Sequence, residues 1–395
     1  MKHTQWIVPA AALVLVGLLS GCETHAQHKK AMVEKWEQST AEAKLETVDT
    51  LLEQGQLAQA EKIVLSCLQS DPDWALAHFA QGRIYLIRER YNSARAAFEK
   101  AVAADPQMHD AWSHLAAVCF LEGRNSQALD AYQKAIDLQP DNPEDIVGAA
   151  QVYMSDNDLD SAGRLLGQAL AKQPYNHQLL LGMAQLHQQA GQTDQAARCY
   201  EQALLKTPQN TAILNALGYC YIATKEWARA AETFERLLKL SEDDAGRQMT
   251  LSTLAMCEFN AGRYDRALQC YDRLSVLCRE DPEVWLNMAQ AALAANRIDR
   301  AADNAQRALR LKPGWTQAWA VLGAAQYLKG EYTQALRSLA YLRNDDTLGG
   351  FGWFMSGRCY SRLGQTAKAQ SAYQQAAGYG PNSPLVAHFL PSEAL

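Results

Sequence analysis

The sequence AWSHLAAVCFLEGRNSQALDAYQKAIDLQPDN at residues 111–142 carries a pattern that returns along most of the chain. Apolar and small residues recur at helical spacing on both sides of Gly123, and Pro140 follows the second half. Such spacing predicts two amphipathic helices. A glycine between them predicts the end of the first helix, and proline ends the second because it cannot donate a backbone hydrogen bond. We therefore expect a helix-turn-helix unit.

The unit recurs with a period of 34 residues, most clearly at 179–210, 213–244 and 318–347. Ten units cover residues 41–383, with three inserted residues at 245–247. The twentieth place of all ten units is alanine, at Ala60, Ala94, Ala128, Ala162, Ala196, Ala230, Ala267, Ala301, Ala335 and Ala369. Alanine lets two helices approach closely. One unit cannot bury its own apolar face, so we expect the units to stack into an all-α solenoid.

Glycine and proline punctuate the units at fixed places. Between the two helices of five units stand Gly123, Gly191, Gly262, Gly330 and Gly364, which we expect to adopt a left-handed conformation. Small residues in the first helix include Gly82, Gly218, Gly323 and Gly357. The pattern resembles the tetratricopeptide repeat, whose consensus places Trp, Leu, Gly, Tyr, Ala, Phe, Ala and Pro in that order. The resemblance implies a right-handed α-solenoid superhelix of about ten helix-turn-helix repeats.

In the tetratricopeptide family the first helix of each repeat lines a concave groove that holds a protein partner. At the lining places this sequence has Phe79, Arg83, Leu86, Phe120, Gln151, Met154, Gln185, Gln188, Asn215, Tyr219, Ile222, Phe259, Asn287, Gln290, Tyr327, Phe354 and Arg358. Aromatic, aliphatic and amide side chains suit an extended peptide or a partner helix. Alternatively, some of these side chains only contact adjacent repeats. Leu181 and Gln185 replace the Lys and Asn of family members that clamp chaperone peptides, so we do not expect that clamp.

The N-terminus has the composition of a secretory signal. Lys2 gives a positive start, and the apolar run at 6–19 is shorter than the roughly 20 residues that a membrane-spanning helix needs. The sequence LSGC at 19–22 resembles the lipobox of bacterial lipoproteins, in which the cysteine receives a diacylglycerol and becomes the new N-terminus. The resemblance implies lipid attachment at Cys22. The alternative is an ordinary secretory signal with a chance cysteine.

These observations divide the chain into four expected parts. They are a removed signal peptide at 1–21, the lipidated Cys22 and a tether at 22–40, the repeats at 41–383, and a partial C-terminal cap at 384–395. In lipoproteins, Asp after the cysteine favours retention in the inner membrane, and here Glu23 follows. In a cell with two membranes, the resemblance therefore implies an outer-membrane anchor with the repeats facing the periplasm.

Composition and motifs argue against an enzyme active site. The chain has 37 Lys and Arg against 43 Asp and Glu, and its net charge of −6 gives no electrostatic reason to expect nucleic acid as a partner. The segments outside the repeats are too short for a catalytic domain, and the sequence has neither a Walker-type phosphate loop nor a His-Glu-x-x-His pair. We expect no enzyme activity, cofactor or metal site. The cysteines other than Cys22 fall within the helical pattern, where they are expected to pack as small apolar residues.

The expected function is protein–protein interaction in the assembly of a cell-envelope machine. Tetratricopeptide lipoproteins resemble two known groups, namely pilotin-like factors of pilus or secretion channels and scaffolds of exopolysaccharide export. The sequence does not choose between them. The alternative is a non-catalytic regulatory subunit of an envelope enzyme complex, such as one that builds cell wall.

Overall fold

The computed structural model describes residues 45–240 and 243–379. Cys22, its tether and the expected cap at 384–395 lie outside the described residues. Within the described ranges all regular elements are helices, so the expected all-α repeat fold is confirmed. The helices alternate as first and second members of antiparallel pairs, and the first described pair is formed by residues 45–53 and α2.

The helix pairs follow the 34-residue period. The first helices of the later pairs are α3 (Ala75–Ile87), α5 (His109–Leu121), α7 (Pro143–Ser155), α9 (His177–Gln189), α11 (Thr211–Ala223), α13 (Asp244–Asn260), α15 (Pro282–Ala294), α17 (Thr316–Leu328) and α19 (Gly349–Arg362). The second helices are α2 (Leu57–Ser70), α4 (Tyr91–Ala104), α6 (Asn125–Leu138), α8 (Leu159–Lys172), α10 (Thr193–Leu204), α12 (Trp227–Leu240), α14 (Tyr264–Leu277), α16 (Ile298–Leu311), α18 (Tyr332–Leu339) with the 3₁₀ helix η1 (Ala340–Leu342), and α20 (Thr366–Ala377).

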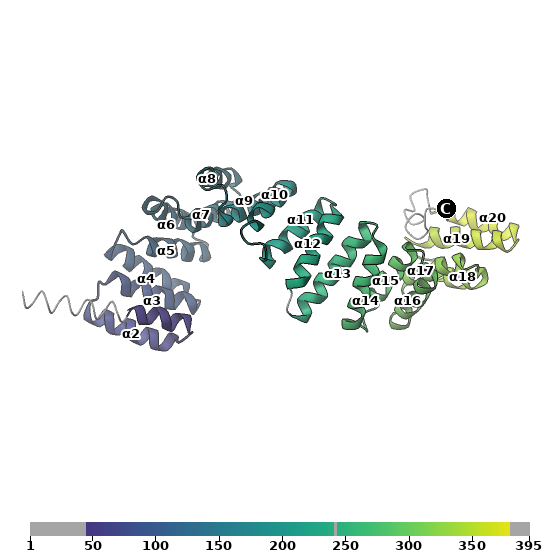
Figure 1. Ribbon diagram of the computed structural model, residues 1–395, viewed down its shortest axis with the longest axis horizontal. Coiled ribbons are helices and arrows are strands. Elements are labelled where there is room, and N and C mark those ends of the chain that lie inside the picture. Colours follow the sequence, from purple (N-terminus) through teal and green to yellow (C-terminus); the bar gives the residue numbers. More distant parts are fainter. Residues whose placement is uncertain (1–44, 241–242, 380–395) are drawn as a thin grey trace, which may run out of the picture. The chain divides into compact units, whose positions relative to one another are not determined.

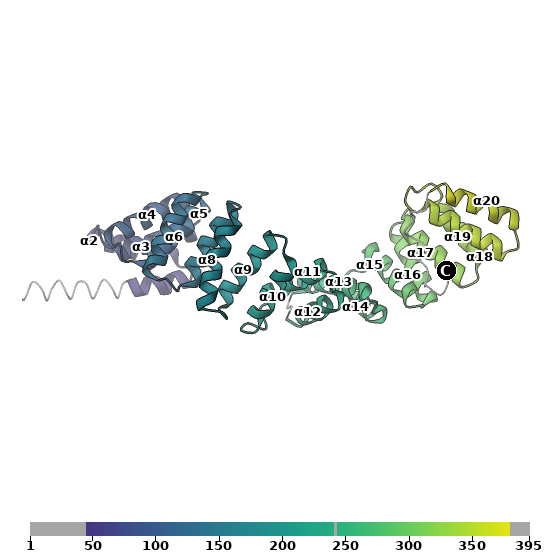
Figure 2. The ribbon, with the colours of Figure 1, turned by 90° about the horizontal axis from the view of Figure 1, so that it is seen from above.

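The chain forms two compact units that divide after Gly182, within α9. In the first unit, consecutive helices from α2 to α8 pack side by side, and in the second unit those from α10 to α20 do the same (Figure 1, Figure 2). First helices of neighbouring repeats also meet, as α5 and α7 do in the first unit and α17 and α19 in the second. We call the surface formed by the first helices of each unit its first-helix face.

The turn inside each pair contains one residue in the left-handed region. Six of these residues are glycines with φ between 71° and 80°, and they include the five predicted from the sequence. At the equivalent place the other four pairs have Glu89, Asn157, Lys225 and Asn296, with φ between 58° and 61°. The turn closes the first helix: Gly123 N–H donates to Phe120 O at 2.9 Å and Arg124 N–H donates to Cys119 O at 2.8 Å.

Close packing between the two helices of a pair depends on small residues, as the sequence predicts. Nine of the ten alanines at the twentieth place are 0% exposed, and Ala369 is 3% exposed. A Cβ atom at Gly82 would lie 2.5 Å from the ring of Phe98, and one at Gly218 would lie 2.7 Å from the ring of Phe234. The missing side chain therefore makes room for the aromatic ring of the second helix.

The three residues inserted at 245–247 do not interrupt the repeat. They are helical, and they lengthen α13 to 17 residues, compared with 13 in α11. The side chain of Asp243 caps this added turn by accepting a hydrogen bond from Gly246 N–H at 2.9 Å. The insertion thus extends the first helix of the seventh repeat at its N-terminus.

Candidate partner-binding surface

In the first unit an aromatic group from three helices lies at the first-helix face. The ring of Phe79 lies edge-on to His114, with centroids 5.1 Å apart, and the fully buried Phe98 lies 5.5 Å from His114. The Arg83 guanidinium lies 5.7 Å from the centre of the Phe79 ring and pairs with Asp49. Burial lowers the pKa of His114, so its imidazole is uncharged at neutral pH. This group places aromatic edges and one cation at the first-helix face of the first unit.

The C-terminal ends of α3 and α5 extend this surface with apolar side chains. Leu86 and Phe120 are half-buried against the core of the first unit. The next residues along the chain are Ile87, 52% exposed, and Leu121, 57% exposed. Sequence reasoning missed these two, although each directly follows an expected groove residue.

The two expected groove residues of α7 differ in exposure. Gln151 is half-buried, but Met154 is only 6% exposed, so the expectation that Met154 lines an open groove is wrong. The Met154 side chain is covered where α7 packs against α5, α6 and α8, whereas Ser155 on the same turn is exposed.

In the second unit the first-helix face exposes Tyr219. Its side chain is 44% exposed, and its ring lies edge-on to the buried Phe234 with centroids 5.5 Å apart. Asn215 and Ile222 on the same helix are half-buried, and Gln185 on α9 is exposed. The packing of Tyr219 on Phe234 fixes one edge of the ring and leaves the other in solvent.

The side-chain amide of Gln188 contacts residues of the two following helices. Its Oε1 accepts a hydrogen bond from the Tyr200 hydroxyl at 2.7 Å, and its Nε2 lies 3.7 Å from Cys220 Sγ. This contact between α9, α10 and α11 matches the alternative in which an expected groove residue joins adjacent repeats.

The next first helices carry the same mixture of aromatic and amide groups. Phe259 lies edge-on to Tyr264 with centroids 5.4 Å apart, and Asn287 and Gln290 on α15 are half-buried. One turn before Phe259, Met256 is 37% exposed, which sequence reasoning missed.

Near the end of the second unit Tyr327 is 6% exposed, so the expectation that it lines an open groove is also wrong. It is covered because α17 packs against α15, α16, α18 and α19. The Arg358 guanidinium lies 5.1 Å from the centre of the Tyr327 ring. Phe354, one turn before Arg358, is half-buried and lies 5.9 Å from the ring of Tyr373.

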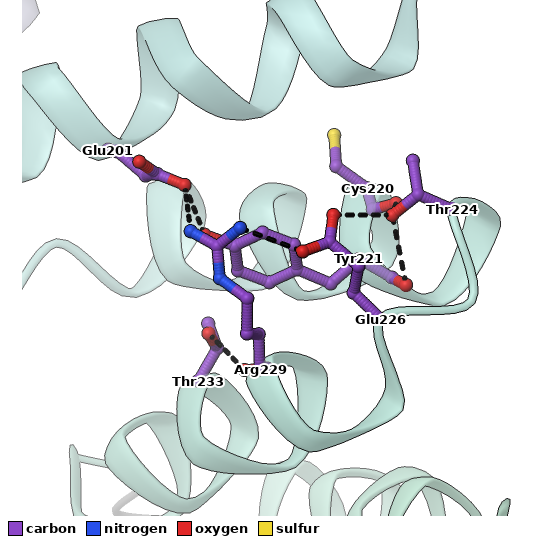
Figure 3. Close-up of polar contacts among 7 residues, drawn as sticks. All are labelled: Glu201, Cys220, Tyr221, Thr224, Glu226, Arg229 and Thr233. Carbon is purple, nitrogen blue, oxygen red and sulfur yellow. Dashed lines mark hydrogen bonds and ion pairs between the residues drawn. The ribbon is translucent and has the colours of Figure 1, made fainter. Parts of the chain in front are cut away.

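Figure 3 shows a polar cluster that joins the fifth and sixth repeats and that sequence reasoning did not find. The hydroxyl of the buried Tyr221 donates to Glu201, and Arg229 bridges Glu201 at 2.5 Å and Glu226 at 2.8 Å. The Arg229 guanidinium also lies 4.3 Å from the centre of the Tyr221 ring. Burial and the neighbouring Glu201 raise the pKa of Tyr221, so the hydroxyl keeps its proton. The cluster holds α10 against α11 and α12.

A second buried pair joins the third and fourth repeats. His109 Nε2 lies 2.6 Å from Oδ2 of Asp145, a residue that is 0% exposed, and His109 Nδ1 lies 2.9 Å from Oδ1 of Asp110. Burial alone would lower the pKa of His109, but hydrogen bonds to Asp110 and Asp145 raise it overall. The charged imidazole is therefore favoured in the folded state.

This raised pKa predicts how stability depends on pH. The ordinary histidine pKa is about 6.5. The contribution of His109 is therefore fully present below that pH and is lost as pH rises through the folded-state pKa. The free energy of unfolding of the wild type should fall as pH rises above 6.5, and that of His109→Gln should fall less. Urea unfolding at several pH values measures both. His114→Gln serves as the contrast, because a lowered pKa makes His114 cost stability as pH falls. A loss above pH 6.5 that is equal in the wild type and His109→Gln would contradict the assignment.

Most thiols of the described residues are buried in the helix packing. All eight cysteines in the described ranges are free. Burial raises the pKa of Cys257 and Cys359 to about 12 and that of Cys270 to about 11. The same ranges contain no group of three or more His, Cys, Asp or Glu side chains able to hold a metal ion. None of their helices is long and apolar enough to cross a membrane.

Family models match most of the described sequence. Models of the tetratricopeptide repeat match residues 45–108, 181–245, 249–291, 286–347 and 352–382. The model of the tetratricopeptide domain of cytochrome c-type biogenesis protein H matches residues 102–212. The chain is a tetratricopeptide repeat protein. The matched segments contain all of the first-helix residues discussed above.

Individual relatives of this tetratricopeptide repeat protein are distant. Anaphase-promoting complex subunit 3 of Schizosaccharomyces pombe is 32% identical over 71 residues, which are 18% of this chain and 11% of that protein. The structure of PilW, a type IV pilus biogenesis factor, is 18% identical with a TM-score of 0.49 and covers 54% of this chain and 98% of its own. A tetratricopeptide repeat protein of Parabacteroides merdae is 16% identical with a TM-score of 0.45, over 63% of this chain and 97% of its own.

Proposed function

We propose that this tetratricopeptide repeat protein is a non-catalytic scaffold of a bacterial cell envelope whose protein partner docks on the first-helix face. The observation that carries the proposal is the 44% exposure of Tyr219 on α11. Large aromatic side chains that remain in solvent on a rigid support are typical anchors of protein interfaces. Ile222, Met256 and Phe259 on α11 and α13 add apolar area, and Asn215 offers an amide to a partner's backbone.

The anchor in this proposal is lipid on Cys22, and the repeats face the periplasm from the outer membrane. The lipobox-like sequence and Glu23 support this part. Each buried methylene of an acyl chain contributes about 0.8 kcal/mol, so the several chains of a lipoprotein hold it lastingly at the membrane. A short tether at 22–40 then raises the effective concentration of the repeats near a membrane-bound partner.

The proposed task is assembly of an envelope machine, either a pilus or secretion channel in the manner of a pilotin, or an exopolysaccharide exporter. The match of residues 102–212 to the tetratricopeptide domain of a cytochrome c-type biogenesis protein supports a role in biogenesis. The partner's docking surface in this proposal is a peptide or helix with apolar side chains, because the first-helix face is rich in aromatic and aliphatic groups.

An affinity pull-down from detergent-solubilised membranes tests the proposal. We expect the native protein to recover one envelope complex, and the double variant Tyr219→Ala with Phe259→Ala to lose it. The variant Cys22→Ser should no longer incorporate radiolabelled palmitate and should leave the membrane fraction.

The matched control is Leu205→Ala with Val276→Ala. These residues are 76% and 62% exposed and lie on the second-helix side of the fifth and seventh repeats. This control should recover the complex as the native protein does. Equal recovery by the Tyr219 and Phe259 variant would place the partner elsewhere, and circular dichroism of each variant separates loss of binding from loss of fold.

A further inference from the structure

The tenth repeat has an unusual charge. Residues 350–383 contain Arg358, Arg362 and Lys368 but no Asp or Glu, although acidic residues outnumber basic ones by 43 to 37 in the whole chain. Each of the other nine repeats contains at least one acidic residue. The last repeat is therefore a positive segment of a negative protein.

Two of these cations meet at one aromatic side chain. Arg358 and Arg362 are one turn apart on α19, on the first-helix face. The Arg358 guanidinium lies 5.1 Å from the centre of the Tyr327 ring. A hydrogen bond to the Tyr327 hydroxyl raises the pKa of Arg362. Tyr327 is 6% exposed and fixed in the packing of α17, so the two arginines share one ordered neighbour.

Arg358 and Arg362 form no ion pair within the described residues, and Nη1 of Arg358 is buried without a hydrogen-bond partner. Other arginines of the second unit do have carboxylate partners, as Arg300 does in Asp272 and Arg297 in Asp265. Two like charges four residues apart on a helix repel each other, and a buried donor without a partner is also unfavourable. An anion bound beside the two guanidinium groups would relieve the repulsion between them.

We propose that Arg358 and Arg362 bind a carboxylate of the protein partner. This rests on the proposed function, in which the partner docks on the first-helix face, and it adds the chemistry of one contact. A guanidinium group offers planar, paired donors that match the two oxygens of a carboxylate. Phe354, one turn before Arg358, supplies an apolar contact beside the charge. The carboxylate belongs to an acidic side chain or to the C-terminus of the partner.

Binding of three fluorescein-labelled octapeptides to the full chain in detergent, followed by anisotropy, tests this inference. The first peptide alternates Glu and Gly and has an amidated C-terminus. The second replaces Glu by Gln and keeps the free C-terminal carboxylate, and the third has Gln and an amidated end. We expect the third to bind most weakly. Preference for the first peptide identifies acidic side chains as the ligand, and preference for the second identifies a terminal carboxylate.

The variant Arg358→Gln with Arg362→Gln should weaken binding of the preferred peptide by about tenfold or more, because hydrogen bonds between charged groups are the strong ones. The control Arg310→Gln with Arg337→Gln removes the same charge from exposed arginines on α16 and α18 and should leave binding unchanged. Binding should also weaken as sodium chloride is raised.

Equal affinity of the three peptides, no binding by either carboxylate peptide, or an equal loss in both double variants would overturn the inference. The pull-down distinguishes this failure from failure of the proposed function. If Tyr219→Ala with Phe259→Ala loses the complex while the peptides ignore the arginines, the docking face stands and only the carboxylate contact is wrong.

Discussion

Replacing Phe234 by alanine should lower the free energy of unfolding by about 3–5 kcal/mol, the usual loss for a large aromatic side chain in a core. Phe234 is 1% exposed, and its ring fills the space that Gly218 leaves between α11 and α12. The backbone of α11 cannot follow the lost volume, because α11 also packs against α10. The alanine variant therefore leaves a cavity inside the sixth repeat. Urea unfolding followed by circular dichroism measures the loss.

Tyr373 provides the matched control for this prediction. It occupies the same place in the tenth repeat and faces Gly357 as Phe234 faces Gly218, but it is 36% exposed. Tyr373→Ala should therefore lower the free energy of unfolding by clearly less than Phe234→Ala, because the wild-type Tyr373 side chain buries less apolar surface. Equal losses in the two variants would contradict the assignment of Phe234 as a packing centre of its repeat.

Two glycine-to-alanine substitutions in the first unit should change the free energy of unfolding in opposite directions. A Cβ atom at Gly82 would lie 2.5 Å from the ring of Phe98, which is itself fully buried and cannot move aside. Gly82→Ala should lower the free energy of unfolding by about 1–3 kcal/mol, the typical cost of overpacking a core. A Cβ atom at Gly167 meets no atom within 4 Å. Gly167→Ala should raise the free energy by roughly 0.5–1 kcal/mol, because alanine restricts the unfolded chain.

A second-site change checks the cause of the first effect. Phe98→Leu replaces the clashing ring with a smaller side chain, so Gly82→Ala should cost less in that background than alone. Urea unfolding of the single and double variants gives the coupling free energy. An additive result, or a loss at Gly167 as large as that at Gly82, would show that the close approach of α3 and α4 does not determine stability.

The regular parts of the fold could be predicted because they depend on residues close together in sequence. The alanine at the twentieth place and the small residue opposite a large ring both allow the two helices of one pair to approach closely. Both are found where the repeat pattern predicts them. The left-handed turn was predictable only where glycine marks it. Glu89 and Lys225 adopt the same conformation, because the hydrogen bonds that close the helix outweigh a strain of about 1–2 kcal/mol.

The candidate surface was less predictable because it depends on neighbouring repeats. The repeat pattern gives the face on which a residue lies, but it does not give its exposure. Tyr219 and Tyr327 both fall at lining places, yet they are 44% and 6% exposed, because α17 is covered by more helices than α11 is at these points. The contact of Tyr221 with Glu201 likewise joins residues 20 apart in two repeats, and no short-range pattern pairs them.

The most direct test of the central claim is site-specific photo-crosslinking in cells, with benzoylphenylalanine placed at one position at a time. Positions 219 and 290 lie on the first-helix face of the second unit, and positions 205 and 276 are exposed on its second-helix side. We predict that one envelope protein is captured from 219 and 290 and not from 205 and 276. Capture of that protein from 205 and 276 alone would contradict the claim that partners dock on the first helices.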